Sequence, residues 1–181
     1  MKPGEGYRHL AILFDYPRDR GVVLDAAESL ARCLAGTGLD VDMAPFVAFV
    51  AASSLGALQE EYVGTFDFNP LCAPYLSHHV HGDTPKKGEF MIRLKELYRS
   101  HGFSPESCEL PDHVAVLFAC AAHLFAGGCD SARTELITAY VTEGLDKLNN
   151  AAASKDDLHW RYPIAAAALL CGAERQEVHH A

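Results

Sequence analysis

The sequence lacks long uncharged apolar runs: none of its 181 residues belongs to a stretch of the roughly 18 needed to cross a bilayer. The polar start of the chain also lacks the apolar core of a signal peptide. Basic residues are in deficit, because Lys and Arg total 15 against 24 Asp and Glu, a net charge of -9. This negative charge disfavours binding to nucleic acid and to anionic lipid, and it favours basic peptides as partners. We therefore expect a cytoplasmic protein with no nucleic-acid binding and no direct membrane insertion.

Paired cysteines and the common catalytic motifs are missing as well. The six cysteines are scattered and contain no C-x-x-C pair, which favours free, buried thiols over a disulfide framework. There is no G-x-x-x-x-G-K-[ST] phosphate loop, no G-x-S-x-G elbow and no H-E-x-x-H metal motif. These absences speak against the common nucleotide-binding, hydrolase and metalloprotease classes without deciding the function.

Helical periodicity dominates what is present. Apolar residues recur at three- and four-residue spacing between Gly, Pro, Asp and Ser, whereas alternating strand patterns are scarce. The pattern predicts an all-α fold: a single compact multi-helix domain over residues 1–173, followed by a frayed tail over residues 174–181. The helices are expected at about residues 10–16, 22–34, 45–66, 85–102, 114–125, 130–148 and 163–171. Of these, the helix at 114–125 is apolar on every side, as a central, surrounded helix would be.

Residues 67–84 are rich in helix breakers and have only a weak period, which predicts a long loop or a short irregular helix. The segment carries His78, His79 and His81, with Asp83 next to them. These side chains would bind a metal if the loop folded them onto one centre, as in a metal sensor or a metal-dependent hydrolase. Histidines of a solvated loop are the simpler interpretation, because no second ligand pair follows at a defined spacing. We expect no metal.

Acidic residues surround this loop and the start of the helix that follows Pro111, while Tyr62, Phe66 and Leu71 supply apolar surface. An apolar groove with an acidic rim would suit a basic amphipathic peptide. An ordinary solvated face beside an ordinary core stripe explains the same pattern. The acidic residues are Glu60, Glu61, Asp67, Asp83, Glu106, Glu109 and Asp112.

Four short motifs occur along the chain in the order in which a known protein family has them. Residues 10–17 resemble L-x-x-L-x-x-Y-P, residues 62–67 resemble Y-V-x-T-F-D, residues 79–82 read H-V-H-G, and residues 109–113 read E-L-P-D-H. In combination they resemble the nitrate reductase delta-subunit (NarJ-type) assembly chaperones, within the TorD/DmsD group of redox-enzyme maturation chaperones. Where that family usually continues with L-E-F after the last motif, this chain has Ala119 in place of the acidic residue.

The resemblance implies an all-helical chaperone that is not an enzyme and carries no cofactor. Such a chaperone binds the N-terminal segment of the apo catalytic subunit of a molybdoenzyme, a respiratory nitrate reductase or a close relative, and keeps it competent for molybdenum cofactor insertion. The family's loop motif corresponds here to His79, His81 and Gly82. The peptide-binding residues that the resemblance implies are Tyr62, Phe66, Asp67, Pro111, Asp112 and His113, and the acidic and apolar pattern adds Leu71 and Glu109.

Overall fold

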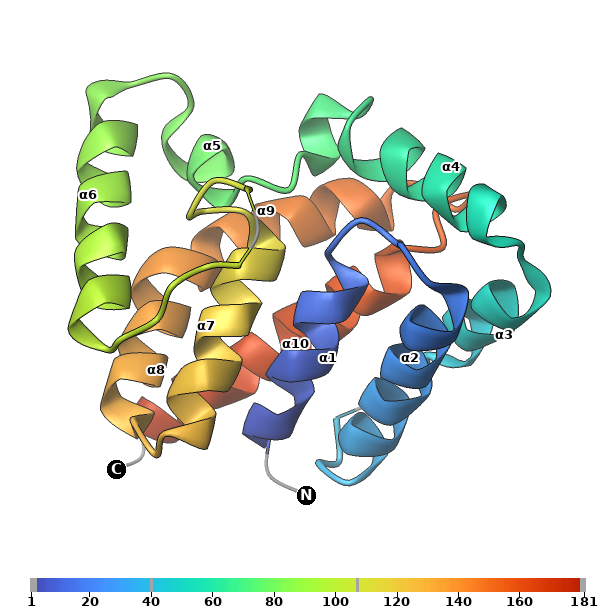
Figure 1. The fold of residues 1–181 in the computed structure, drawn as a ribbon, viewed down its shortest axis with the longest axis horizontal. Coiled ribbons are helices and arrows are strands. Elements are labelled where there is room, and N and C mark those ends of the chain that lie inside the picture. The colour runs from blue at the N-terminus through green and yellow to red at the C-terminus, as the bar shows by residue number, and fades with distance from the viewer. Residues whose placement is uncertain (1–2, 40, 107, 180–181) are drawn as a thin grey trace.

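In a computed structural model, which describes residues 3–39, 41–106 and 108–179, the chain is a bundle of helices with no β-strand in the described part (Figure 1). The predicted all-α fold is therefore confirmed. The α-helices are α1 (Gly6–Leu13), α2 (Arg20–Ala35), α3 (Ala44–Ala52), α4 (Leu55–Phe66), α5 (Leu76–His81), α6 (Pro85–Ser100), α7 (Val114–Ala126), α8 (Asp130–Leu136), α9 (Thr142–Ala153) and α10 (Arg161–His179). The 3-10 helix η1 (Pro3–Glu5) precedes α1, the 3-10 helix η2 (Pro70–Cys72) lies between α4 and α5, and the π-helix η3 (Ile137–Val141) lies between α8 and α9.

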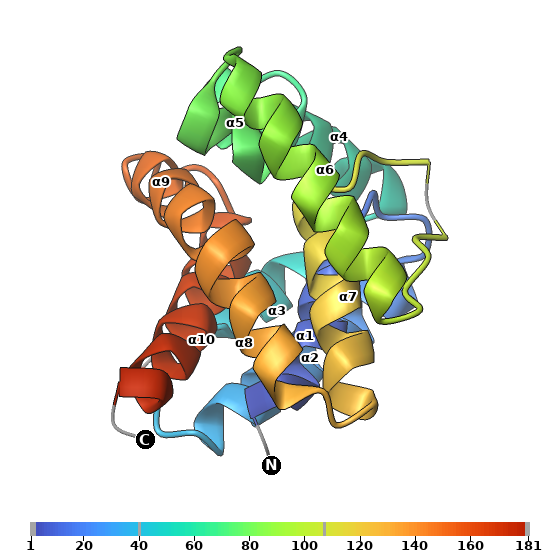
Figure 2. The same cartoon turned by 90° about the vertical axis from the view of Figure 1, so that its left-hand side faces the viewer.

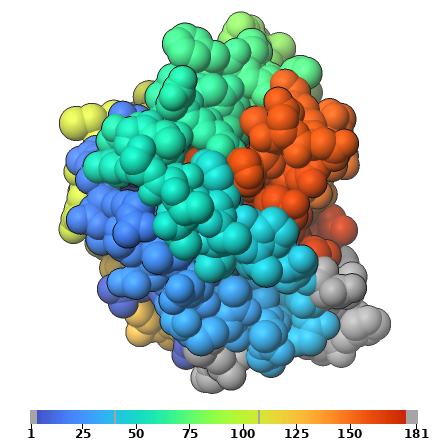
Figure 3. All heavy atoms as spheres, turned by 90° about the vertical axis from the view of Figure 1, so that its right-hand side faces the viewer, coloured from blue at the N-terminus to red at the C-terminus, as the bar shows by residue number. Residues whose placement is uncertain are grey.

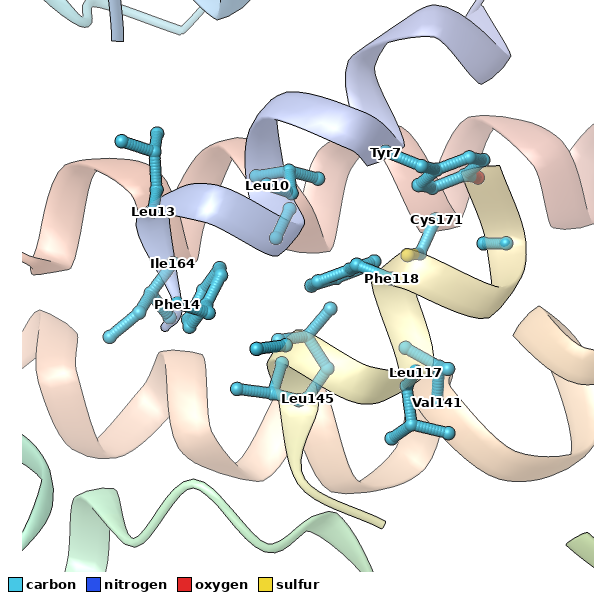
Figure 4. Packing of buried hydrophobic residues seen from close by; sticks show 14 of the residues in the cluster. Tyr7, Leu10, Leu13, Phe14, Leu117, Phe118, Val141, Leu145, Ile164 and Cys171 are labelled. Atoms are coloured by element: carbon cyan, nitrogen blue, oxygen red, sulfur yellow. The ribbon is translucent and has the colours of Figure 1, made fainter. Parts of the chain in front are cut away.

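The centre of the bundle is α7, as its apolar sequence predicts. It packs against α1 on one side and α8 on the other. The ring of Phe118 lies between the ring of Tyr7 on α1 and that of Phe14, the residue that follows α1, with centroid distances of 5.9 Å and 5.6 Å (Figure 4). These three rings are completely buried, so α1 and α7 form one rigid unit in the core.

Trp160, the single tryptophan, joins the start of α10 to α1 and α4. Its indole nitrogen donates to the carbonyl oxygen of Leu13 at 2.8 Å. The indole ring packs edge-on against Tyr62 at 5.7 Å and Phe66 at 6.3 Å. The face of α4 that carries these two residues is therefore turned into the core.

Two predicted helices have different boundaries in the structure. The helix expected over 45–66 is divided into α3 and α4, because the hydroxyl of Ser54 accepts a hydrogen bond from Ala57 N at 3.2 Å and caps a new helix. Together with α2, these two helices cover much of the face seen in Figure 3, beside a C-terminal segment drawn in orange. The helix expected over 130–148 begins as predicted but continues through η3 and α9 to Ala153.

The segment over 67–84 is more ordered than a long loop. It contains η2 and the short helix α5, so the short irregular helix was the better of the two interpretations. Near α5 the backbone of Leu76 donates to Asp112 O at 3.0 Å, which fixes the segment against the start of α7. This contact joins residues far apart in sequence, and a local pattern carries no information on it.

The helix α10 extends to His179, so it includes residues 174–179 of the segment where a frayed tail is expected. Glu174 itself is buried, and its carboxylate accepts hydrogen bonds from the Tyr7 hydroxyl and, at 2.7 Å, from Arg133 Nε. Residues 180–181, the rest of the predicted tail, lie outside the described residues. None of the described helices combines the length and the apolar character that crossing a bilayer would require.

Candidate functional site

An open groove of about 730 Å³ lies between α1, the start of α2, α7 and the loop over residues 102–109. Three of its lining residues are alanines: Ala11 on α1, and Ala115 and Ala119 one turn apart on α7. We call these three the alanine strip. Because their side chains are small, two closely packed helices leave room between them for side chains from another molecule. Larger apolar residues also line the groove: Ile12, Tyr16, Val22, Val116 and Phe103.

The charged residues of the groove are mostly acidic. Its lining includes Asp15, Asp19, Glu106 and Glu109, against a single Arg or Lys, which is Arg18. An apolar groove with this acidic rim favours a ligand that presents apolar and basic side chains together. Of the acidic residues that the sequence analysis named as a rim, Glu106 and Glu109 line this groove between α1 and α7.

The loop over 102–109 is held in place by aromatic and histidine contacts. The Nε2 atom of His123, on α7, lies 3.0 Å from the carbonyl oxygen of His101. The ring of Phe103 packs between His123 at 5.6 Å and Tyr98 at 5.0 Å. Gly102 permits the turn into the loop, because its φ of +66° suits glycine. The acidic wall of the groove is thus attached to both α6 and α7.

Next to the groove, residues 74–77 are fastened to residues 109–114, an arrangement that we call the clamp. Besides the Leu76–Asp112 backbone bond, Val114 N donates to Pro74 O at 2.8 Å. The hydroxyl of Ser77 donates to the Asp112 carboxylate. Asp112 and its near neighbour Val114 therefore join the start of α5 to the start of α7.

Asp112 and His113 are buried within the clamp, with 0% and 3% of their surfaces exposed. His113 Nδ1 accepts a hydrogen bond from Ala115 N at 3.2 Å and so caps the start of α7. One carboxylate oxygen of Asp112 has no hydrogen-bond partner among the described residues. Pro111 contributes its carbonyl oxygen, which accepts from the Tyr98 hydroxyl at 2.7 Å.

Carboxylates surround the outer edge of the clamp. Burial lowers the pKa of His113, and the negative charges of Glu109, Asp15, Asp112 and Asp67 oppose that lowering. The Tyr75 hydroxyl donates to Glu109 at 2.8 Å, and burial together with this hydrogen bond raises the pKa of Tyr75 to about 12. Glu109 therefore belongs to both regions: it lines the groove and it holds the clamp.

The predicted peptide-binding residues fall into separate places. Tyr62 and Phe66, only 3% and 1% exposed, belong to the core, and the Tyr62 hydroxyl donates to Phe14 O at 2.8 Å. Asp67 and Leu71 are exposed but lie outside the groove lining. Of the eight residues predicted from the sequence, only Glu109 lines the groove.

Sequence reasoning missed the alanine strip, because small residues at helical spacing resemble core. The only available sign was Ala119, the position where the resemblance led us to expect an acidic residue. It also missed Asp15 and Asp19, which lie in a short connection without a recognisable pattern. Both sets become a site only when α1 and α7 are placed side by side.

The three histidines of the loop motif point to different partners. His79 Nε2 lies 2.7 Å from Ala73 O, and burial lowers the pKa of this histidine. His78 Nδ1 lies 3.9 Å from Asp83, whereas the ring of His81 packs on Phe90 with a centroid distance of 5.5 Å. Within the described residues no three His, Cys, Asp or Glu side chains are grouped so as to hold a metal ion. The geometry does not favour the metal-binding alternative.

The family profile described as nitrate reductase delta subunit matches residues 34–161, more than half of the chain. The chain belongs to the nitrate reductase delta subunit family. The matched range includes the motifs at 62–67, 79–82 and 109–113, and the groove residues of α7 and the preceding loop. The motif at 10–17 and the part of the groove formed by α1 and the start of α2 lie outside that range.

Three relatives agree with this membership over parts of their length. A Bacillus subtilis protein named as a nitrate reductase molybdenum cofactor assembly chaperone, NarJ, is 37% identical over 78 residues, which are 42% of this chain and 42% of that protein. The Escherichia coli K12 chaperone NarJ is 35% identical over 66 residues, 36% of this chain and 28% of the relative. The nitrate reductase-like protein NarX of Mycobacterium tuberculosis H37Rv is 31% identical over 112 residues, 62% of this chain and 17% of the relative. The match thus spans less than half the length of each relative.

A solved structure agrees over nearly the whole chain. A crystal structure from Archaeoglobus fulgidus, described as a redox enzyme maturation protein, has a TM-score of 0.52 and covers 97% of this chain and 93% of its own. Its sequence identity is 20%, so this likeness concerns the fold. It supports the helical arrangement that brings α1 and α7 together.

Proposed function

We propose that the protein is an assembly chaperone that binds the N-terminal segment of the apo catalytic subunit of a nitrate reductase or a closely related molybdoenzyme. It keeps that subunit competent for molybdenum cofactor insertion and acts in the cytoplasm, without catalysis of its own. Family membership and the names of the Bacillus subtilis and Escherichia coli relatives support this function.

The observation that carries the proposal is the groove between α1 and α7, with the alanine strip inside and acidic residues at its rim. A peptide helix would lay leucine- or phenylalanine-sized side chains over the alanine strip, as amphipathic helices do in apolar grooves. Its Lys or Arg side chains would meet Asp15, Glu106 and Glu109. Burial of apolar surface provides affinity, and the charges select a basic peptide.

The buried residues predicted for peptide binding have a different part in this proposal. Asp112 and His113 position the loop that carries Glu109. Tyr62 and Phe66 pack against Phe14 and Trp160 and so support the end of α1. They act on peptide binding through the shape of the groove. Asp67, Leu71 and Glu109 are exposed and are the predicted residues available for direct contact.

Ala119→Leu is the sharpest test, because it fills the groove without changing its charge. Isothermal titration with a synthetic peptide copying the N-terminus of the catalytic subunit encoded beside this chain should show saturable binding to the wild-type protein. Ala119→Leu should weaken it at least about tenfold, the effect of losing one buried anchor. Ala153→Leu, at an exposed alanine that ends α9, is the matched control and should bind as the wild type does. Equal binding by both variants would remove the groove from the proposal.

A further inference from the structure

The turn after α4 holds two large apolar side chains out in solvent. Phe68 is 82% exposed and Leu71 is 65% exposed, the two highest values among the large apolar residues of the described chain. They are three positions apart, on either side of Asn69 and Pro70. We call these two residues the apolar pair.

The backbone beneath the apolar pair is fixed. Phe68 N donates to Val63 O at 3.0 Å, which closes the end of α4. Cys72 N donates to Asn69 O at 2.8 Å, and Cys72 is completely buried. Buried residues lie between the exposed ones along this turn, so the fixed backbone holds the two side chains in solvent. Burying them against a partner therefore costs little backbone conformational entropy.

The apolar pair is connected to the groove through the end of α4. Asp67, next to Phe68, donates through its backbone nitrogen to Val63 O of α4 at 2.9 Å, and its negative charge is among the causes that raise the pKa of Tyr75. Tyr75 is hydrogen-bonded to Glu109, which lines the groove. On the other side, the ring of Tyr16 in the groove contacts Tyr62 of α4 at 5.7 Å. Figures 1 and 2 show the end of α4 and the loop before α7 in the same upper part of the molecule.

We infer that the peptide is bound at two apolar contacts, one in the groove and one on the apolar pair, with a basic side chain between them over Asp67 and Glu109. This inference rests on the proposed function and adds a feature of the ligand. The peptide must continue past the groove with at least one further apolar residue, separated from the first by Lys or Arg. The occupant is a basic peptide because the residues that join the two contacts are carboxylates.

The two contacts divide the work of recognition. The groove takes apolar side chains into a confined space, where size matters, as the alanine strip indicates. The apolar pair lies on an open surface, where it adds buried area with little selection for shape. A peptide truncated to the part that fills the groove therefore still binds, but more weakly.

A pair of peptides and a pair of variants test the inference by isothermal titration. The long peptide copies the N-terminal segment of the neighbouring catalytic subunit, and the short one is its shortest truncation that still binds. Phe68→Ser should weaken binding of the long peptide about tenfold and leave the affinity for the short peptide unchanged. Ile92→Ser, at a 61% exposed apolar residue of α6 outside the groove, is the matched control and should change neither. Melting temperatures of both variants equal to that of the wild type establish that the fold is retained.

The outcomes separate this inference from the function on which it rests. If Ala119→Leu abolishes peptide binding but Phe68→Ser leaves the affinity for the long peptide unaffected, the second contact is overturned. The proposal that the groove binds the peptide is then retained. If Phe68→Ser weakens both peptides equally, the apolar pair belongs to the same contact as the groove, and the two-contact arrangement is overturned. Absence of any peptide binding would overturn the inference together with the proposed function.

Discussion

The groove and the clamp share one stretch of chain, residues 109–119, and use it in opposite ways. In the clamp, Asp112 and His113 are polar residues taken out of solvent to fasten α5 to the start of α7. In the groove, Ala115 and Ala119 belong to an apolar helix and yet line an open space. The residues that stand out in the sequence thus hold the structure, while inconspicuous ones form the surface for a ligand.

This contrast separates stability from binding in a way that experiments can examine. Changes in the clamp should lower the free energy of unfolding, because the buried side chains of Asp112 and His113 hydrogen-bond to Ser77 and to Ala115 N. Changes in the alanine strip should leave stability nearly unaltered and reduce peptide binding. A clamp variant that unfolds no more easily than the wild type would contradict the division.

The largest effect is expected at Gly144, where α9 approaches the clamp most closely. A Cβ atom there would lie 2.7 Å from Leu76 O and 2.8 Å from Leu76 Cβ, so an alanine at this position would push the backbones of α5 and α9 apart. Gly144→Ala should lower the free energy of unfolding by about 3 kcal/mol, measured by urea denaturation. Gly64→Ala, in α4 with open space at the same position, is the control and should stabilise the protein by about 0.5 kcal/mol. Similar effects of the two changes would show that α5 and α9 are not packed as described.

A smaller loss is expected when Asp112 loses its hydrogen-bond donor. Ser77→Ala leaves the buried carboxylate without a side-chain partner, because its second oxygen already has none among the described residues. The free energy of unfolding should fall by about 2 kcal/mol. In an Asp112→Asn background the same change should cost less, since a neutral amide is cheaper to leave unpaired than a charge. An equal cost in both backgrounds would mean that the charge of Asp112 is not what Ser77 stabilises.

The pH dependence of stability reports on His113. Burial lowers its pKa, so between the folded value and the ordinary histidine value the unfolded chain binds more protons. Stability should therefore fall as pH drops through the ordinary pKa of about 6.5 toward the lower folded value. Protonation also removes the acceptor that caps α7. Thermal unfolding from about pH 7 to about pH 5 should show a shallower decline for His113→Asn, which keeps a capping oxygen but does not titrate.

The remaining pH dependence of that variant provides its own check. His79 has a pKa lowered by burial in the same direction, so it should retain part of the decline. Identical slopes for the wild type and His113→Asn would place the pH sensitivity outside the clamp.

The helices were predictable because their causes are local. Periodicity and breakers located α7 almost residue for residue, and Pro85 marked the start of α6. The division at Ser54 was missed although serine is a good capping residue, since apolar residues continue on both sides of it. The burial of Glu174 could not be predicted, because its partner Tyr7 lies at the other end of the chain.

The site was predictable in chemistry but not in position. Composition indicated apolar surface with an acidic rim, and the groove has that character. Which residues form it depends on the approach of α1 to α7, a contact between segments about a hundred residues apart in the chain. Glu109 was named from the sequence because it belongs to a recognisable motif in an acidic region, and it also lines the groove. Ala115 could not be identified, because it is itself a mostly buried alanine of an apolar helix and its sequence context does not indicate a groove.

Glu109 gives the smallest effect on stability and the most informative one, because it is the residue that the two regions share. Glu109→Gln keeps an oxygen that can accept from the Tyr75 hydroxyl and removes one negative charge from the rim. The free energy of unfolding should change by no more than about 0.5 kcal/mol, as expected for an exposed carboxylate. Peptide binding should weaken at low salt and lose part of its salt dependence, since one charge pair is absent. Glu135→Gln, an exposed carboxylate of α8 outside the groove, should leave both unchanged. A large loss of stability with an unaltered salt dependence would assign Glu109 to the clamp alone.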